Sequence, residues 1–132
     1  MMDYTQMKSL IPKDKFDFTP FETLMKISED KVQPILPELL FGVADMNWPI
    51  ATVMVNVLAR FPDSVIPLIE ELLKPTETDE EWKYFVIVSL IPALPTDSQK
   101  LLEKSIKRIL DSPTDGEVHG GVLEVVKNYV GQ

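Results

Sequence analysis

Few side chains in this sequence have the chemistry of catalytic groups. The 132 residues include no Cys and one His, His119, which lies between Gly116 and Gly120. Triad catalysis needs a His base beside a Ser or Cys nucleophile, and a lone His in a glycine-rich loop gives such a site little support. We interpret His119 as a solvated loop residue. We therefore predict no catalytic residues and expect that the chain is not an enzyme.

Metal-binding patterns are also weak in this sequence. Glu117 and His119 offer one carboxylate and one imidazole, whereas a zinc site requires further nitrogen or sulfur ligands. The acidic residues 79–81 lack the Asp-x-Asp-x-Asn-Gly loop of a calcium site. The sequence thus predicts no metal and no cofactor. A hydrolase that uses carboxylates together with Lys83 or Tyr84 stays an alternative.

The acidic side chains are concentrated in the middle of the chain. Thirteen Lys and Arg residues against 21 Asp and Glu residues give a net charge of −8. This charge disfavours DNA, RNA or an anionic membrane as the main partner. Residues 63–95 contain two basic and seven acidic side chains, a net charge of −5. An acidic edge attracts a basic protein, although acidic residues at a helix start also stabilise the helix dipole.

Four basic residues share one face of a helix predicted over residues 96–110. Apolar residues occupy the opposite face, which is the pattern of an amphipathic surface helix. We interpret the basic face as a solvated outer surface. Nucleic-acid binding through residues 100–108 is an alternative, but no aromatic side chain lies between the cations to stack on bases. The four residues are Lys100, Lys104, Lys107 and Arg108.

Apolar residues recur at helical spacing along most of the chain. Residues 50–61 are the clearest case, because their apolar side chains follow the i, i+3, i+4, i+7 pattern of one helix face. Thr19, Asn47 and Asp79 are predicted to cap three of the helices. The predicted helices cover about residues 19–27, 28–44, 48–61, 63–74, 80–91 and 96–110, and a last helix runs from Glu117 or Gly121 to Val130.

A strand interpretation competes with helices in two places. Val53, Val55 and Val57 alternate with other residues, and residues 84–91 are rich in side chains that also favour strands. The length of these segments, their capping residues and the lack of an Asn-Gly or Asp-Gly turn between them favour helices.

The sequence repeats a two-helix pattern. Trp48 and Trp82 occupy equivalent places 34 residues apart, and Pro37 and Pro67 are 30 residues apart. One helix pair cannot cover its own apolar faces, so stacked pairs must form the core, with the two Trp side chains packed between them. We predict a single domain over residues 1–132, with an extended segment at 1–18 and helical units at about 19–61, 63–95 and 96–130.

Four sequence blocks resemble a known family. They are LIPKDKFD at residues 10–17, DMNWP at 45–49, WKY at 82–84 and LIPALP at 90–95. Together they resemble the signature of a bacterial domain family of unknown function, whose members are similar to HEAT and armadillo repeats. The resemblance covers roughly residues 8–112. It implies an all-α fold, an α-α superhelix of about three stacked helix pairs plus a short N-terminal helix, and it assigns no chemistry to any residue.

The second helix of each unit is expected to line the concave side of such a superhelix. Polar side chains there would face a protein or peptide partner, so we predict a non-enzymatic binding module. An acidic inhibitor of the immunity type, acting on a toxin or enzyme, is an alternative. The predicted partner-binding residues are Asn47, Asn56, Asp79, Glu80, Glu81, Lys83 and Tyr84.

The ends and the uncharged segments of the chain indicate a compartment. Residues 1–10 contain no apolar run typical of a secretory signal. The longest uncharged segments, 46–59 and 84–96, are 14 and 13 residues long, and a membrane span needs about 18. The absence of Cys fits a reducing environment. We therefore expect a cytoplasmic monomer with no membrane partner.

Overall fold

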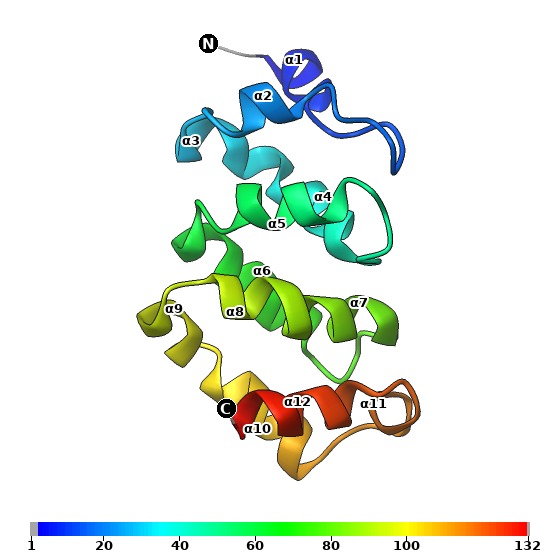
Figure 1. Cartoon of the computed structure of the whole chain (residues 1–132). Helices are drawn as coiled ribbons and strands as arrows, with labels where there is room; N and C mark the ends of the chain where they lie inside the picture. Colours follow the sequence, from blue (N-terminus) through cyan, green and yellow to red (C-terminus); the bar gives the residue numbers. More distant parts are fainter. Residues whose placement is uncertain (1–2, 132) are drawn as a thin grey trace.

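The computed structural model describes residues 3–131, and within this range the chain forms helices and no strand. The helices lie in successive layers, from α1 at the N-terminal end to α10, α11 and α12 at the C-terminal end (Figure 1). The all-α prediction is thereby confirmed, and residues 50–58 and 84–91 are not strands.

The N-terminal layer begins with a helix where an extended segment is predicted. Asp3 and Gln6 form a capping box, in which each side chain accepts a hydrogen bond from the other residue's backbone N–H, and this box starts α1 (Tyr4–Lys8). The prediction of an extended segment over 1–18 is therefore wrong at residues 4–8, and residues 1 and 2 lie outside the described range. The next helix, α2 (Phe21–Leu24), starts after Pro20.

Prolines divide the next predicted helix into four short elements. Pro34 and Pro37 have no backbone N–H to continue a helix, and each stands in the first turn of a new element. The elements are α3 (Glu29–Val32), the 3-10 turn η1 (Gln33–Ile35), α4 (Leu36–Leu40) and the 3-10 turn η2 (Phe41–Val43). Gly42 permits a close approach to α5, because a Cβ there would lie 3.0 Å from Met54 Cγ.

Two helices form the centre of the stack. α5 (Ala51–Leu58) begins after Ile50, three residues later than predicted, and α6 (Pro62–Leu72) begins with Pro62 in its first turn. Arg60, between them, donates hydrogen bonds to the carbonyls of Leu24 at 2.6 Å and Ile27 at 3.1 Å. The guanidinium thereby satisfies carbonyls at the end of α2 and ties the first two layers together.

The predicted helix over 80–91 is confirmed with one irregularity. Asp79 accepts a hydrogen bond from the Trp82 backbone N–H at 3.1 Å and so caps the helix, as predicted. The segment then runs as α7 (Glu80–Phe85), the π-helical turn η3 (Val86–Leu90) and α8 (Ile91–Ala93). The Ser89 hydroxyl donates to the Phe85 carbonyl within this turn.

Within the described residues, the chain after Pro95 forms four helices, of which α10, α11 and α12 make the C-terminal layer (Figure 1). The predicted helix over 96–110 breaks at residues 101–102 into α9 (Thr96–Lys100) and α10 (Glu103–Asp111). The last helix, predicted to begin at Glu117 or Gly121, is α12 (Val122–Val130), so the later start is confirmed, and a separate short helix, α11 (Asp115–His119), precedes it. Gly121 joins them with φ = 81°, a left-handed conformation that residues with a Cβ rarely adopt.

One continuous core runs through all the layers. The buried residues predicted from helical spacing include Leu39 and Val43, Met54 and Leu58, Ile69 and Leu73, Val86 and Leu90, and Ile106 and Ile109. No single helix within residues 3–131 is both long and apolar enough to cross a membrane, although α5 and α6 pass that test as a pair bent by 118°.

Candidate functional site

The predicted partner-binding residues do not form one exposed strip. Asn47, Asn56, Asp79 and Glu81 are exposed, whereas Glu80 and Tyr84 are half-buried. Two of the predicted caps are also absent. The backbone N–H of Asn47 donates to the Asp45 carboxylate at 2.8 Å, and the Thr19 hydroxyl donates to Asp17 at 2.6 Å. Both residues therefore belong to turns organised by a neighbouring Asp, and neither caps a helix.

Lys83 departs furthest from its predicted place, because its side chain is 0% exposed. The ammonium group Nζ donates to Glu117 Oε2 at 2.9 Å and to the Lys74 carbonyl at 3.0 Å. Burial of a charge is tolerated only when such partners replace water. Lys83 thus faces the interior between α7 and α11 rather than a ligand, which corrects the expectation of a recognition role.

Arg108 also turns inward, away from the basic face of α10. Its guanidinium pairs with both carboxylate oxygens of Glu117, with Nη2 to Oε2 at 2.7 Å, and donates to the Leu73 carbonyl at 2.6 Å. Bidentate pairing of this kind is among the strongest hydrogen-bonded arrangements in proteins. Three of the four predicted cations remain exposed, Lys100 on α9 and Lys104 and Lys107 on α10, which weakens the nucleic-acid alternative.

Glu117 is the centre of a buried charge cluster that also includes Lys83 and Arg108. Its side chain is 0% exposed, and burial alone would raise the pKa of its carboxyl group. Hydrogen bonds from Arg108, from the Thr114 backbone N–H at 2.9 Å and from Lys83 outweigh burial. They lower its pKa from 4.5 to about 2. Glu117 is therefore an anion under all ordinary conditions.

Glu80 lies at the edge of the buried charge cluster, and one of its carboxylate oxygens has no hydrogen-bond partner within the described residues. Glu80 Oε2 is 3.9 Å from Lys83 Nζ, and no hydrogen-bond partner for this oxygen lies among residues 3–131. Burial raises the pKa of the Glu80 carboxyl group, and the Lys83 charge opposes this only in part. The side chain packs against Gly120, where a Cβ would lie 2.7 Å from Glu80 Cβ.

The buried charge cluster has the geometry of a structural tie. None of the grooves described below is lined by Lys83, Arg108 or Glu117. Lys83 and Glu117 are fully buried between α7, α10 and α11, and Arg108 is 25% exposed. Among residues 3–131, no three His, Cys, Asp or Glu side chains are placed to hold a metal ion.

An aromatic ridge lies on the surface between two layers. We define it as Trp48, Phe41 and Trp82. The Phe41 ring centroid is 5.7 Å from that of Trp48 and 5.3 Å from that of Trp82, the latter edge to face. Trp82 Nε1 donates to the Leu40 carbonyl at 3.2 Å. The two Trp residues pack against the same ring, yet Phe41 itself is 49% exposed, which is unusual for a side chain of this size.

A groove opens at the Trp48 end of the aromatic ridge. This N-terminal groove has a volume of about 680 Å³. Its surface is mostly apolar, and both signs of charge occur at its rim. The apolar lining residues are Ile11, Pro12, Phe41, Gly42, Trp48, Ile50 and Met54, and the charged ones are Lys13, Asp14, Lys15 and Glu38.

A smaller, acidic groove opens at the Trp82 end. It has a volume of about 260 Å³ between α4, α6 and the start of α7. Pro37, Leu40, Leu68, Leu72 and Trp82 line it together with Thr76, Glu71 and Glu77. Among residues 3–131, the charged lining residues are the two Glu, and Glu71 pairs with Lys74 at 2.7 Å. The aromatic ridge thus connects an apolar groove with an acidic one.

Comparison with known families gives a match over residues 10–129 to a domain of unknown function, DUF5071. The chain belongs to the DUF5071 family. A search of curated proteins finds no match. The DUF5071 match begins at Leu10, a residue of the buried core, and extends into α12. It therefore contains the buried charge cluster, the aromatic ridge and both grooves.

Sequence reasoning missed three features of this DUF5071 domain, and only the first had a signal in the sequence. Thr114 and Glu117 have the Thr-x-x-Glu spacing of a capping box, which the structure contains. Lys83 had no local signal, because Glu117, with which it pairs, lies 34 residues further along the chain. Phe41 also had no signal, because the Trp82 ring that packs against it belongs to α7, in a separate part of the chain.

Proposed function

We propose that this chain is a non-enzymatic module that binds a peptide segment of a partner protein across the aromatic ridge. The observation that carries the proposal is the half-exposed Phe41 ring, held between Trp48 and Trp82 with a groove at each end. Aromatic side chains next to an apolar pocket are the usual anchor points of protein recognition.

The layered helices support a superhelix of the HEAT or armadillo type as the scaffold. In such scaffolds each helix pair contacts only its neighbours, and the edges of successive pairs form an extended binding surface. The aromatic ridge crosses the boundary between two predicted helical units, because Phe41 and Trp48 belong to one unit and Trp82 to the next. A bound peptide would therefore run along the stack.

The two grooves differ in charge, which defines the ligand we propose. The N-terminal groove fits a large apolar side chain because its floor is apolar. The acidic groove fits a Lys or Arg, which could also stack on the Trp82 ring. The exposed Asp79 and Glu81 lie at the start of the same helix and add to the negative potential. The proposed ligand is a segment that combines an apolar anchor with basic residues.

A random peptide library displayed on phage provides the test. Selection on the immobilised chain should enrich peptides with a large apolar residue and one or more Lys or Arg nearby. Phe41→Ser should weaken the selected peptides at least about tenfold, which corresponds to about 1.4 kcal/mol. Phe18→Ser is the matched control, because Phe18 is 48% exposed and does not line either groove.

Circular dichroism of both variants shows whether they remain folded. Equal binding by the wild type and Phe41→Ser would contradict the proposal, and so would selection of peptides without a common pattern. Selection of peptides whose binding is lost equally in the two variants would place the binding surface elsewhere.

An inhibitor of a basic toxin or enzyme is a second candidate, favoured by the charge of −5 over residues 63–95. Electrostatic attraction of this kind acts mainly on the association rate. Glu77→Lys and Glu81→Lys together should slow association with such a partner and reduce its dependence on salt. An association rate that is the same in the wild type and the double variant would contradict the inhibitor proposal.

A further inference from the structure

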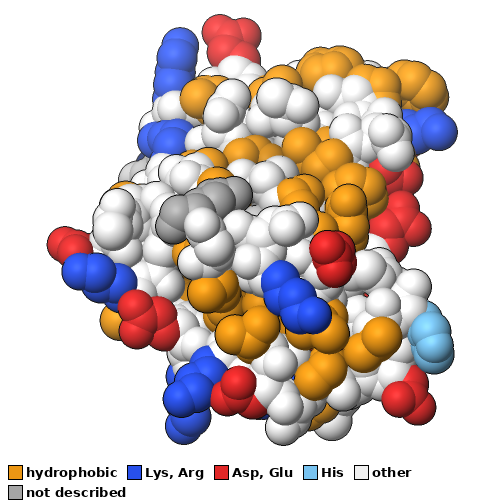
Figure 2. Space-filling model, turned by 60° about the horizontal axis from the view of Figure 1, so that its bottom comes forward, with side chains coloured by type: hydrophobic (Ala, Val, Ile, Leu, Met, Phe, Trp, Pro, Cys, Tyr) orange, Lys and Arg blue, Asp and Glu red, His pale blue; other side chains and the backbone are white. Residues whose placement is uncertain are grey.

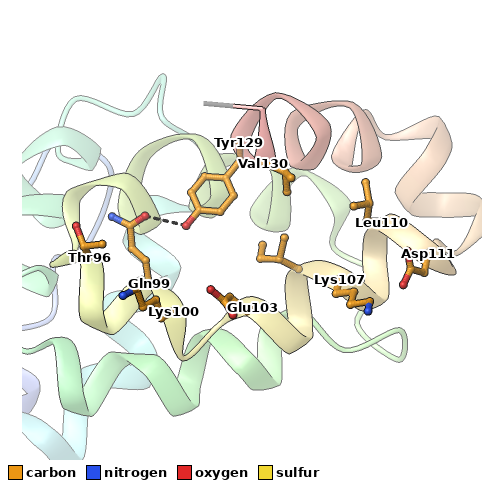
Figure 3. Close-up of a pocket in the computed structure, with 10 residues that line it drawn as sticks. Thr96, Gln99, Lys100, Glu103, Lys107, Leu110, Asp111, Tyr129 and Val130 are labelled. Atoms are coloured by element: carbon orange, nitrogen blue, oxygen red, sulfur yellow. Dashed lines mark hydrogen bonds between the residues drawn. The ribbon is translucent and has the colours of Figure 1, made fainter.

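The C-terminal end of the stack has a third groove, distant in the chain from the aromatic ridge. This C-terminal groove has a volume of about 630 Å³ and lies between α9, α10 and α12 (Figure 3). Its walls are held in place by hydrogen bonds. Tyr129 Oη donates to Gln99 Oε1 at 2.7 Å, and Gln99 Nε2 donates to the Leu94 carbonyl at 2.8 Å. The groove is thus a built feature that joins α9 to α12.

The lining of the C-terminal groove is apolar at its centre. Ile106 and Leu110 of α10 line it together with Tyr129 and Val130 of α12, and Val130 is 52% exposed. Apolar side chains gather on this end of the molecule between charged ones (Figure 2). An apolar surface of this kind, surrounded by polar residues, is typical of an interface.

The charges around the C-terminal groove are balanced. The lining contains two cations, Lys100 and Lys107, and two anions, Glu103 and Asp111. The positive Lys100 and the negative Asp111 lie at opposite ends of the groove (Figure 3). Residues 96–132 carry a net charge of only −1, against −5 for residues 63–95. A second copy of this chain that approaches in the antiparallel direction therefore brings opposite charges together across the groove, and it meets less like-charge repulsion here than at residues 63–95.

We propose that the C-terminal groove is the interface of a two-fold symmetric homodimer, in which α10 of each copy packs antiparallel to α10 of the other. In a two-fold interface, a contact from one position to a second implies the reverse contact as well. Glu103 of each copy then pairs with Lys107 of the other, and Lys100 with Asp111. Leu110 and Val130 become buried. This dimer replaces the expectation of a monomer and does not depend on peptide binding at the aromatic ridge.

Charge reversal on α10 tests this symmetry directly. Glu103→Lys alone places Lys opposite Lys twice, and Lys107→Glu alone places Glu opposite Glu twice. Each single variant should weaken the dimer at least tenfold in sedimentation equilibrium. The double variant Glu103→Lys/Lys107→Glu restores both pairs and should recover the wild-type dissociation constant. An equal mixture of the two single variants should dimerise as well, because a mixed pair has opposite charges at both contacts.

A second set of variants tests the apolar centre. Val130→Asp should give a monomer, because it places a carboxylate in the buried part of the interface. Val118→Asp is the matched control, since Val118 is 47% exposed and does not line the groove. Circular dichroism establishes that each variant is folded.

Three results would overturn the dimer. The first is a wild-type chain that stays monomeric in sedimentation up to about 1 mM, a concentration at which even very weak pairs associate. The second is a dimer that Val130→Asp leaves intact. The third is a mixture of the two charge variants that associates no better than either alone. Loss of peptide binding in Phe41→Ser with an unchanged dimer would leave this inference standing, so failures of the two proposals are distinguishable.

Discussion

At the scale of single residues, Glu117 connects three helices through one carboxylate. It pairs with Lys83 of α7 and Arg108 of α10 and caps its own helix through Thr114. Removal of one member of a buried ion pair leaves its partner charged and unpaired, which costs more than the pair contributes. The stability of the C-terminal layer should therefore depend strongly on the charge of Glu117.

The pH dependence of unfolding tests this role. The pKa of Glu117 is lowered to about 2 in the folded chain from 4.5. Its contribution to stability is therefore complete above pH 4.5 and is lost as the pH falls from about 4.5 to 2. Glu117→Gln should lower the free energy of unfolding by roughly 3 kcal/mol at pH 7. Urea unfolding at several pH values should show this difference shrinking below pH 4.5.

Glu124→Gln is the control for this experiment, because Glu124 is exposed on α12. Its unfolding free energy should stay within about 0.5 kcal/mol of the wild type at every pH. A difference between the wild type and Glu117→Gln that does not vary with pH would show that the lost contacts, and not the lost charge, cause the destabilisation.

Glu80 should act in the opposite direction. Burial raises the pKa of its carboxyl group, so the folded chain holds the charged form at a cost when the pH lies above that pKa. Glu80→Gln removes this cost and adds an N–H donor, and it should raise the free energy of unfolding at pH 7. The gain should disappear at acid pH, where Glu80 is protonated in both states. Urea midpoints at pH 7 and pH 4 measure it, and a destabilised variant at pH 7 would contradict the argument.

The role of a polar side chain was predictable from the sequence where its hydrogen-bond partner is a few residues away, and was not predictable where the partner lies far along the chain. The Asp79 cap was predictable because its acceptor and donor are three residues apart. The place of Lys83 was not, because Glu117 lies 34 residues further along the chain. An exposed and a buried Lys have the same local sequence pattern. Lys83 is buried because it pairs with Glu117, and this contact exists only in the folded chain.

At the scale of elements, helical spacing of apolar residues predicted the segments well and their ends poorly. The helix over 80–91 and the apolar face of residues 50–61 are confirmed. Thr19 and Asn47 have the chemistry of caps, but Asp17 and Asp45 two residues earlier bind them in turns instead. The break at residues 101–102 had no proline or glycine to mark it.

Gly121 is the element boundary with the clearest steric requirement. It joins α11 and α12 with φ = 81°. A Cβ in this conformation costs about 1–2 kcal/mol, so Gly121→Ala should lower the unfolding free energy by about that amount. Gly131→Ala is the control, because Gly131 has φ = −77° at the end of α12. Urea unfolding compares the two variants, and equal stability would show that the α11–α12 connection can adopt another conformation.

At the scale of the whole molecule, the all-α class was predictable because apolar residues recur at helical spacing along most of the chain. Each layer has an apolar face that only a neighbouring layer can cover, and one core runs from Leu10 to Val126. The surface was not predictable in the same way. Phe41, Trp48 and Trp82 come together only because successive layers place them side by side, so a groove between layers has no pattern within any single helix.

A stack of layers held by local contacts should also unfold by layers. The buried charge cluster joins the C-terminal layer to α7, whereas Arg60 ties the first layers together through α2. Glu117→Gln should therefore speed amide hydrogen exchange in α12 by about 100-fold, as expected for roughly 3 kcal/mol. Exchange in α5 should change little, because the contacts of that helix are intact. Equal acceleration in α5 and α12 under native conditions would mean that the chain opens as one cooperative unit and that its layers are not independent.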